Sequence, residues 1–240
     1  MTDLHCHILP GIDDGSEDLA MTLELLRAEQ KQGVDRVIFT PHFDPEKTTV
    51  DDFWNKRDRA FVVTREACRR DPELSKLHFK RGAEVYFRPS LKDIECSKLC
   101  YTESPYLLLE LSFTREQLFL NETIYDLRTR GIIPIIAHVE RYPYIMKDIS
   151  KLEHLVEQGC LVQTNCETLA RDGSQAKKIM ELMQDGLVHL VSTDAHHPEK
   201  RPVNMRAGLK VVDKHLGRAW TNELIKNGNL IFAGRKGPQN

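Results

Sequence analysis

The chain opens with Asp3-Leu4-His5-Cys6-His7-Ile8-Leu9-Pro10-Gly11-Ile12-Asp13-Asp14-Gly15, a short apolar strand carrying two histidines and followed by an acidic turn. Side chains alternate between the two faces of a strand. We therefore expect His5 and His7 to project together while Cys6 points the opposite way. Two imidazoles that share one face at the end of a strand can bind the same metal ion. The opening thus predicts a metal-binding pair at the carboxyl end of the first strand.

One pattern of helix, glycine and apolar strand then recurs four times, at Gln32-Gly33-Val34, Arg130-Gly131-Ile132, Gln158-Gly159-Cys160 and Asp185-Gly186-Leu187. Glycine just past a helix takes the left-handed conformation that closes the last turn. The apolar run after each glycine has the length and branching of a buried parallel strand. Together with three further apolar segments, these junctions predict seven strands at 3–8, 34–40, 77–85, 106–111, 132–138, 160–165 and 187–194.

Helices are predicted between these strands, several of them after capping residues such as Ser16, Thr114 and Ser174. Their ranges are 17–32, 50–70, 115–130, 150–158, 174–185, 203–216 and 220–227. Alternation of this kind requires a parallel sheet, either open or closed as a barrel. A length of 240 residues suits a single domain spanning 1–240, with a frayed end after residue 228.

Composition excludes several classes of function. The formal net charge is −2 with both signs interspersed, which offers no field for nucleic acid or an anionic membrane. The N-terminus lacks a signal sequence and no segment has the roughly 20 apolar residues that span a bilayer, so we expect a cytoplasmic protein without membrane insertion. The six cysteines are expected to be reduced, buried side chains.

Ionisable residues gather at the predicted strand ends. The last residues of six of the seven strands include a histidine or a carboxylate, and parallel strands bring these ends to one face. The candidate metal ligands among them are His5, His7, His42, Glu84, Glu110, His138, Asp194 and His196. Any one of these could be an ordinary buried polar residue. Many such groups at one rim would cost several kcal/mol per uncompensated charge, and divalent cations would remove that cost.

The other five histidines serve as an internal comparison, because their predicted positions call for no metal. They lie early in strands, within helices or on the opposite face: His78, His189, His154, His215 and His197. Asp13 and Asp14 follow the first strand in a turn, where capping or turn formation is the simpler explanation for both.

The segments at the strand ends resemble the PHP superfamily, and more closely its bacterial manganese-dependent protein-tyrosine phosphatases of capsule and exopolysaccharide synthesis. The resemblance covers residues 3 to about 205 and is most specific in the thirteen-residue opening. Its other motifs are Thr40-Pro41-His42, Gly82-Ala83-Glu84-Val85, Ala137-His138-Val139-Glu140-Arg141-Tyr142 and Thr193-Asp194-Ala195-His196. The chain departs from the family at Phe43 and at 163–166, which affects pocket shape and removes no expected ligand.

The resemblance implies a distorted seven-stranded (β/α)7 barrel, with parallel strands surrounded by helices, and a cluster of three divalent ions. It adds Asp14 to the ligands. It groups His5, His7, Glu84 and Asp194 around one ion, Glu84, Glu110 and His138 around a second, and Asp14, His42 and His196 around a third. Manganese is favoured, and Fe²⁺ or Zn²⁺ would also suit oxygen and nitrogen ligands without thiolate.

Such a site predicts hydrolysis of a phosphate monoester by a metal-activated hydroxide. Arg141 and Arg201 follow two of the predicted ligands and are expected to bind phosphate oxygens as bidentate forks. A surface ion pair is the alternative for each. No cysteine has an arginine six positions later, so the sequence does not favour a thiol-based tyrosine phosphatase.

The implied substrate is phosphotyrosine on a protein, and the implied partner is the tail of a bacterial tyrosine kinase. Three alternatives remain from the sequence: a PHP phosphatase of a small metabolite such as histidinol phosphate, an amidohydrolase, and a catalytically inactive metal-binding scaffold. The metabolite phosphatases usually carry histidine where Glu110 stands, and an amidohydrolase would need an eighth strand. Oligomeric state and the native metal stay open.

Overall fold

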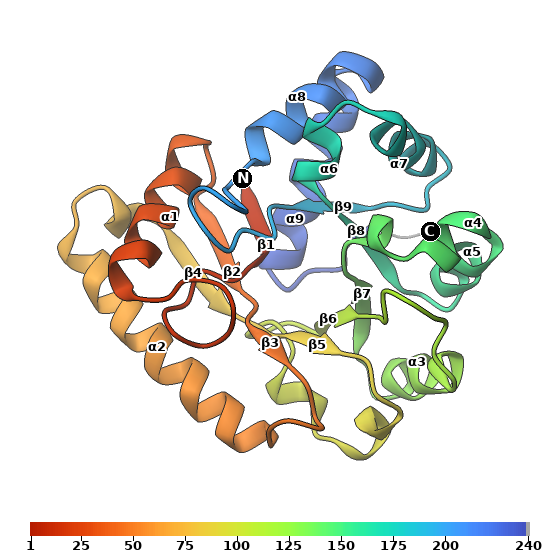
Figure 1. The fold of residues 1–240 in the computed structure, drawn as a ribbon, viewed down its shortest axis with the longest axis horizontal. Helices are drawn as coiled ribbons and strands as arrows, with labels where there is room; N and C mark the ends of the chain where they lie inside the picture. The colour runs from red at the N-terminus through yellow and green to blue at the C-terminus, as the bar shows by residue number, and fades with distance from the viewer. Residues whose placement is uncertain (239–240) are drawn as a thin grey trace.

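A computed structural model describes residues 1–238 of the chain and shows parallel strands surrounded by helices (Figure 1). The strands are β1 (Thr2–Cys6), β2 (Arg36–Phe39), β3 (His42–Phe43), β4 (His78–Arg81), β5 (Glu84–Tyr86), β6 (Tyr106–Glu110), β7 (Ile133–Ile136), β8 (Leu161–Asn165) and β9 (Leu190–Ser192). They form two parallel sheets with the orders β1-β2-β4 and β3-β5-β6-β7-β8-β9. The fold is therefore α/β with curled parallel strands.

Nine strands appear where seven were predicted, because the segment predicted at 77–85 is interrupted and the strand predicted at 34–40 is followed by a further short strand, β3. Pro41 separates β2 from β3, and proline has no N–H to continue the ladder. Gly82 separates β4 from β5, where an added Cβ would lie 2.5 Å from the Tyr101 ring. The two sheets stay in contact at this point, since Glu84 N at the start of β5 donates to Thr40 O, just after β2, at 3.2 Å.

The two ends of the strand array also meet. Cys6 at the end of β1 forms an isolated parallel bridge with Ala195, just after β9. The buried carboxylate of Asp3 fastens the same junction, because its two oxygens accept from the N–H and the hydroxyl of Thr193 at 3.0 and 2.5 Å. This contact places the residues that follow β9 beside those that follow β1.

The helices form the outer layer. They are α1 (Leu19–Lys31), α2 (Val50–Arg70), α3 (Leu120–Thr129), α4 (Pro143–Lys147), α5 (Ser150–Glu157), α6 (Cys166–Ala170), α7 (Ser174–Gln184), α8 (Met205–Leu216) and α9 (Arg218–Phe232). All seven predicted helices are present, and the short α4 and α6 were missed. Within residues 1–238, no helix has both the length and the apolar character needed to cross a membrane.

Several predicted boundaries were wrong. The N-cap of α1 is Asp18, whose carboxylate accepts from Met21 N, whereas Ser16 instead donates to Asp18 O. The third helix starts at Leu120, six residues after the expected cap Thr114, and Ser174 is itself the first residue of α7.

The predicted frayed end was also wrong for residues 229–238. Helix α9 continues to Phe232 and contacts β1 and β9, and Gly237 N donates to Tyr106 Oη at 2.6 Å. Residues 239–240 lie outside the described part of the chain.

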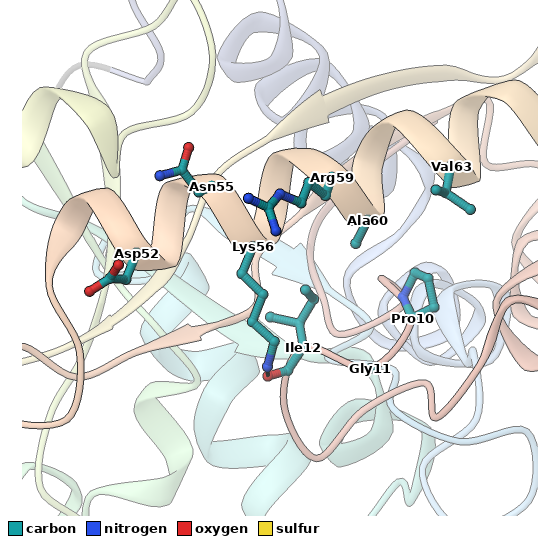
Figure 2. Close-up of a pocket in the computed structure, with 9 residues that line it drawn as sticks. All are labelled: Pro10, Gly11, Ile12, Asp52, Asn55, Lys56, Arg59, Ala60 and Val63. Atoms are coloured by element: carbon teal, nitrogen blue, oxygen red, sulfur yellow. Dashed lines mark hydrogen bonds between the residues drawn. The ribbon is translucent and has the colours of Figure 1, made fainter.

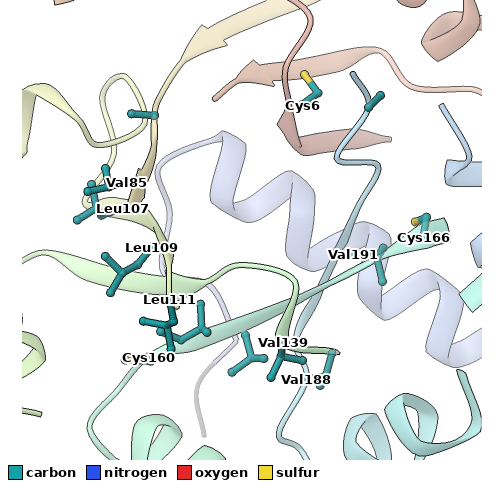
Figure 3. Close-up of a cluster of buried hydrophobic side chains, with 14 of the residues drawn as sticks. Cys6, Val85, Leu107, Leu109, Leu111, Val139, Cys160, Cys166, Val188 and Val191 are labelled. Atoms are coloured by element: carbon teal, nitrogen blue, oxygen red, sulfur yellow. The ribbon is translucent and has the colours of Figure 1, made fainter. Parts of the chain in front are cut away.

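Alternation along the strands divides the core into two layers. Leu108 belongs to an inner cluster that also takes side chains from β1, β2, β7, β8 and β9. Its neighbours Leu107 and Leu109 face the outer cluster beneath the helices (Figure 3). Burying a leucine side chain of this kind is worth about 1.5–3 kcal/mol. The two clusters fix which strand faces point into the curled sheet.

Helix α8 approaches α6 closely at Gly208, where an added Cβ would lie 2.7 Å from Cys166 O. We expect Gly208→Ala to lower the free energy of unfolding by about 1–3 kcal/mol, because the backbone must move to accept the methyl group. Gly173→Ala is the matched control, since an added Cβ there has no neighbour within 4 Å and φ is negative. Urea denaturation measures both variants, and equal stabilities would contradict the close approach.

Candidate metal centre

Nine ionisable side chains converge at the carboxyl ends of the strands, and we call them the rim cluster. Its members come from β1, β3, β5, β6 and the segments after β1, β7 and β9: His5, His7, Asp14, His42, Glu84, Glu110, His138, Asp194 and His196. Seven of them are buried, His42 is half-buried and Asp14 is exposed. The structure thus brings together every residue that the sequence analysis named as a ligand.

The tautomers of His5 and His7 follow from their hydrogen bonds. His7 Nδ1 lies 2.7 Å from the Asp13 carboxylate, which can only accept, so His7 Nδ1 carries the proton. His5 Nδ1 lies 3.2 Å from Gln163 Oε1, an amide oxygen that also accepts from His138 N. Both Nε2 atoms are therefore unprotonated in the neutral rings, and they face each other at 3.2 Å.

Glu84 lies at the centre of the rim cluster. Its Oε2 is 3.0 Å from His42 Nδ1, 3.1 Å from His7 Nε2 and 3.3 Å from His5 Nε2, and its Oε1 is 2.7 Å from His138 Nε2. With the His5 and His7 protons on the Nδ1 atoms, three sets of lone pairs point at one small volume. Lone pairs so arranged repel one another unless a positive charge lies between them.

The charges of the rim cluster depend on one another. Burial would raise the pKa of Glu84, but His5 and the other nearby imidazoles outweigh this and hold it well below the usual range. Burial raises the pKa of Glu110, and the neighbouring charge of Glu84 adds to the increase. Burial also lowers the pKa of His196, whereas the Asp13 and Glu84 carboxylates outweigh burial and raise the pKa of His7.

One buried atom has a lone pair and nothing to bind. His196 Nδ1 lies 2.8 Å from the backbone oxygen of Asp194, so the proton is on Nδ1 and Nε2 is free. Within residues 1–238, Nε2 has no hydrogen-bond partner, and the nearest carboxylate oxygen, on Asp14, is 3.6 Å away. A buried ring nitrogen without a partner is costly in a protein interior. The donor set therefore fits divalent cations.

Four groups of these side chains offer ligand atoms within 4.8 Å of one another. Asp14, His42 and His196 lie together, as expected, and His7 joins them. His5 and His7 lie with Glu84. The other two groups, His42 with Glu84 and Glu110, and His5 with His138 and Asp194, differ from the family pattern. The geometry thus permits more than one division of the ligands among ions.

Two amide side chains that the sequence analysis did not select support the rim cluster from below, and we call them the amide relay. Gln163 accepts from His5 and from His138 N, and its Nε2 donates to Asn165 Oδ1 at 2.9 Å. Asn165 Nδ2 in turn donates to Asp194 Oδ2 at 2.8 Å. The relay orients three ligands from three segments. Its signal in the sequence was a run of three polar residues, Gln163-Thr164-Asn165, at the end of a buried strand.

Two carboxylates beside the rim cluster position other groups. Asp13 accepts from His7 Nδ1, His42 N and Gly15 N. Glu140 is buried and accepts from Asn165 N at 2.8 Å, so it holds the turn after β7 against β8. Both carboxylates are saturated with donors.

Arg141 and Arg201 both reach the rim cluster. Arg201 Nη2 lies 2.5 Å from Asp194 Oδ2, and Arg141 Nη1 lies 3.6 Å from the same oxygen. The Arg141 guanidinium also stacks 4.4 Å over the Phe113 ring. Both side chains are partly exposed, at 41% and 33%. Their donors also leave Asp194 Oδ1 as the oxygen that faces His5 and His7.

The five comparison histidines lie elsewhere. His154 and His215 are on helix surfaces beside Gln158 and Asp172, and His189 accepts from a backbone N–H. None of the five enters a candidate metal group within residues 1–238. The six cysteines are all buried and free, and burial raises the pKa of Cys100 and Cys160 to about 12. A thiolate nucleophile is therefore absent from the described residues.

The turn that carries Asp14 rests on α2. Lys56 Nζ donates to Ile12 O at 2.9 Å, and a cavity of about 480 Å³ lies beside this contact (Figure 2). The rim cluster contributes no residue to its lining. We place the chemistry at the rim cluster, because that is where the ionisable groups converge.

Comparison with known proteins relates the chain to one family. The model of the family described as capsular polysaccharide synthesis, CpsB/CapC, matches residues 1–233. The tyrosine-protein phosphatase YwqE of Bacillus subtilis is 32% identical over 97% of this chain and 91% of its own length. The tyrosine-protein phosphatase CpsB of Streptococcus pneumoniae is 26% identical over 94% of this chain and 95% of its own.

Solved structures give the same relation. A chain from the crystal structures of YwqE from Bacillus subtilis and CpsB from Streptococcus pneumoniae, described as metal-dependent tyrosine phosphatases, matches with a TM-score of 0.87 and 28% identity, over 100% of this chain and 97% of that one. A histidinol phosphate phosphatase from Lactococcus lactis matches with a TM-score of 0.55 and 14% identity, covering 89% of this chain and 92% of that one. At this identity the likeness reflects the fold alone.

The amide relay predicts an effect on metal binding. We expect Gln163→Leu to weaken Mn²⁺ binding about 10–100-fold, because His5 loses the acceptor that fixes its tautomer. Gln184→Leu, at an exposed glutamine, is the control and should bind as the unchanged protein does. Isothermal titration calorimetry measures both, and equal affinities for Gln163→Leu and the control would refute the role of the relay.

Proposed function

We propose, for a chain that belongs to the capsular polysaccharide synthesis family CpsB/CapC, that the rim cluster holds the metal ions with which it hydrolyses phosphotyrosine. The protein is a metal-dependent tyrosine phosphatase of the PHP type. The observation that carries the proposal is the convergence of unprotonated imidazole nitrogens and carboxylate oxygens on Glu84 Oε2. Only cations relieve that arrangement without protonating the ligands.

Three divalent ions are the number we propose. The four carboxylates carry four negative charges, and the five imidazoles bind ions as neutral ligands. Three divalent ions would leave the site positive before substrate enters, which suits a phosphate monoester. Mn²⁺ is favoured for these oxygen and nitrogen ligands, with Fe²⁺ or Zn²⁺ as alternatives. When bound, such ions lower the pKa of coordinated water and neutralise phosphate charge.

Two arginines beside the rim cluster are the groups that would bind the phosphate. We propose that Arg141 and Arg201 bind phosphate oxygens, because each presents a guanidinium at the rim with part of its surface open. Their hold on Asp194 keeps both in place before substrate arrives. Tyrosinate, with a pKa near about 10, is a tolerable leaving group, so no side chain is assigned as general acid.

Other features of the protein stay proposals. A bacterial tyrosine kinase with a phosphorylated tail is the partner we propose, because the relatives are tyrosine phosphatases of a capsule synthesis family. We further propose that the nine strands count as seven barrel positions of one domain, since β2 with β3 and β4 with β5 are each one interrupted segment. A cytoplasmic location stays a prediction from the sequence.

Treatment with a chelator or with a cysteine-alkylating reagent should distinguish metal-dependent catalysis from thiol catalysis. We expect the protein with Mn²⁺ to hydrolyse p-nitrophenyl phosphate and phosphotyrosine peptides faster than histidinol phosphate. Exhaustive chelation should abolish turnover, whereas alkylation of cysteines should not, because all six are buried and outside the rim cluster. Full activity after chelation would refute the assignment, and histidinol phosphate as the best substrate would refute the choice of substrate.

Single substitutions should locate the site. We expect Asp194→Ala to lower kcat by at least about 100-fold, because it removes an oxygen ligand and leaves Arg201 without its partner. His154→Ala, on the surface of α5, is the control and should retain full turnover. Steady-state kinetics with p-nitrophenyl phosphate measure kcat for both variants. Similar kcat values would contradict the placement of the active site at the rim cluster.

A further inference from the structure

The loop between β6 and α3 exposes large apolar side chains. Leu118 is 78% exposed and Phe119 is 60% exposed, which is unusual for neighbouring residues of this size. Phe119 also has a φ of +63°, in the left-handed region that favours glycine or asparagine. Neither burial nor backbone preference explains a phenylalanine here. Strained positions of this kind tend to cluster at ligand-binding sites.

This loop forms one wall of a groove of about 340 Å³, which we call the peptide groove. The other wall is the segment that follows β5, and the lining includes Tyr86, Phe87, Arg88, Arg115, Leu118 and Phe119. Gln117 crosses between the walls, since its amide accepts from Ser112 N and donates to Phe87 O. The groove therefore has a fixed floor and a lining that combines apolar and charged side chains.

The peptide groove lies beside β5 and β6, the strands that carry Glu84 and Glu110 of the rim cluster. Phe87 N donates to the backbone oxygen of the ligand Glu110 at 2.8 Å, and Ser112 lies two residues beyond Glu110. Tyr86 pairs with Glu110 across β5 and β6. An extended peptide advances about 3.3 Å per residue. The residues beside a phosphotyrosine held at the rim would thus reach the groove within a few positions.

Arg115 is the group in the groove that would bind an acidic neighbour. Arg88 is paired with Asp44 and Glu46, and Glu116 is paired with Lys151. Within residues 1–238, Arg115 has no ion partner, although it is exposed at the same wall. Among the described residues, the groove therefore presents the unpaired guanidinium of Arg115 beside exposed apolar side chains, with one carboxylate in excess around Arg88.

We propose that the peptide groove binds the segment flanking the phosphotyrosine of a protein substrate, in extended form. It takes an apolar side chain against Leu118 and Phe119 and an acidic side chain at Arg115. The inference rests on the proposed function of the rim cluster, and it adds a source of selectivity for protein substrates over small phosphate esters.

The test compares two substrates on the manganese-loaded, full-length protein. One is p-nitrophenyl phosphate, which has no flanking residues, and the other is a phosphotyrosine peptide with leucine and glutamate beside the phosphotyrosine. We expect the double variant Leu118→Ser/Phe119→Gly to lower the ratio of peptide to p-nitrophenyl phosphate kcat/KM by about tenfold, equivalent to about 1.4 kcal/mol. Glycine adopts a positive φ readily, so we expect the Phe119→Gly change in this variant to leave the protein folded.

The role of the Arg115 charge is tested by reversing its sign. Arg115→Glu should change the preference from the glutamate peptide to a counterpart with lysine in place of glutamate. Tyr125→Ser is the matched control, because Tyr125 is 70% exposed on α3 and does not line the groove. An unchanged substrate ratio in the double variant, including an equal fall for both substrates, would overturn the proposal, as would an unchanged peptide preference in Arg115→Glu.

Activity of the unaltered protein distinguishes failure of the peptide groove from failure of the metal centre. If it hydrolyses p-nitrophenyl phosphate but the variants do not alter the ratio, the peptide groove fails and the metal centre stands. If it hydrolyses neither substrate with Mn²⁺, the proposed function fails and the groove proposal fails with it.

Discussion

Repulsion among lone pairs and negative charges around Glu84 is the constraint on which the rest of the structure depends. Five imidazoles and four carboxylates occupy one rim, and most of them are buried. An uncompensated buried charge costs several kcal/mol, so the arrangement is stable only with cations or extra protons. The curled parallel strands bring the groups together, and bound divalent ions would convert their mutual repulsion into a shared attraction.

The surrounding side chains prepare the rim cluster for that role. Asp13 and Gln163 place the His7 and His5 protons on Nδ1, so both Nε2 atoms face inward. Asp3 binds Thr193 and so brings the segment carrying Asp194 beside β1. Such outer contacts orient ligands and raise their affinity for metal. The fold and the site are thus stabilised by the same buried hydrogen bonds.

Much of this arrangement could be predicted from the sequence, because glycine junctions mark where several strands begin and ligands stand out as charged residues beside apolar runs. The interruption at Gly82 could not, since it depends on the Tyr101 ring arriving from a distant segment. The roles of Gln163 and Asn165 escaped for the same reason: an amide in a strand shows no chemistry until its partners are in place. Phe119 carried no local signal of its left-handed backbone.

The most direct measurement is anomalous diffraction at the manganese absorption edge, from crystals grown with Mn²⁺. The account predicts strong peaks enclosed by the rim cluster, with Glu84, His7 and His5 among the side chains in contact. Peaks confined to the molecular surface, or none near Glu84, would contradict it.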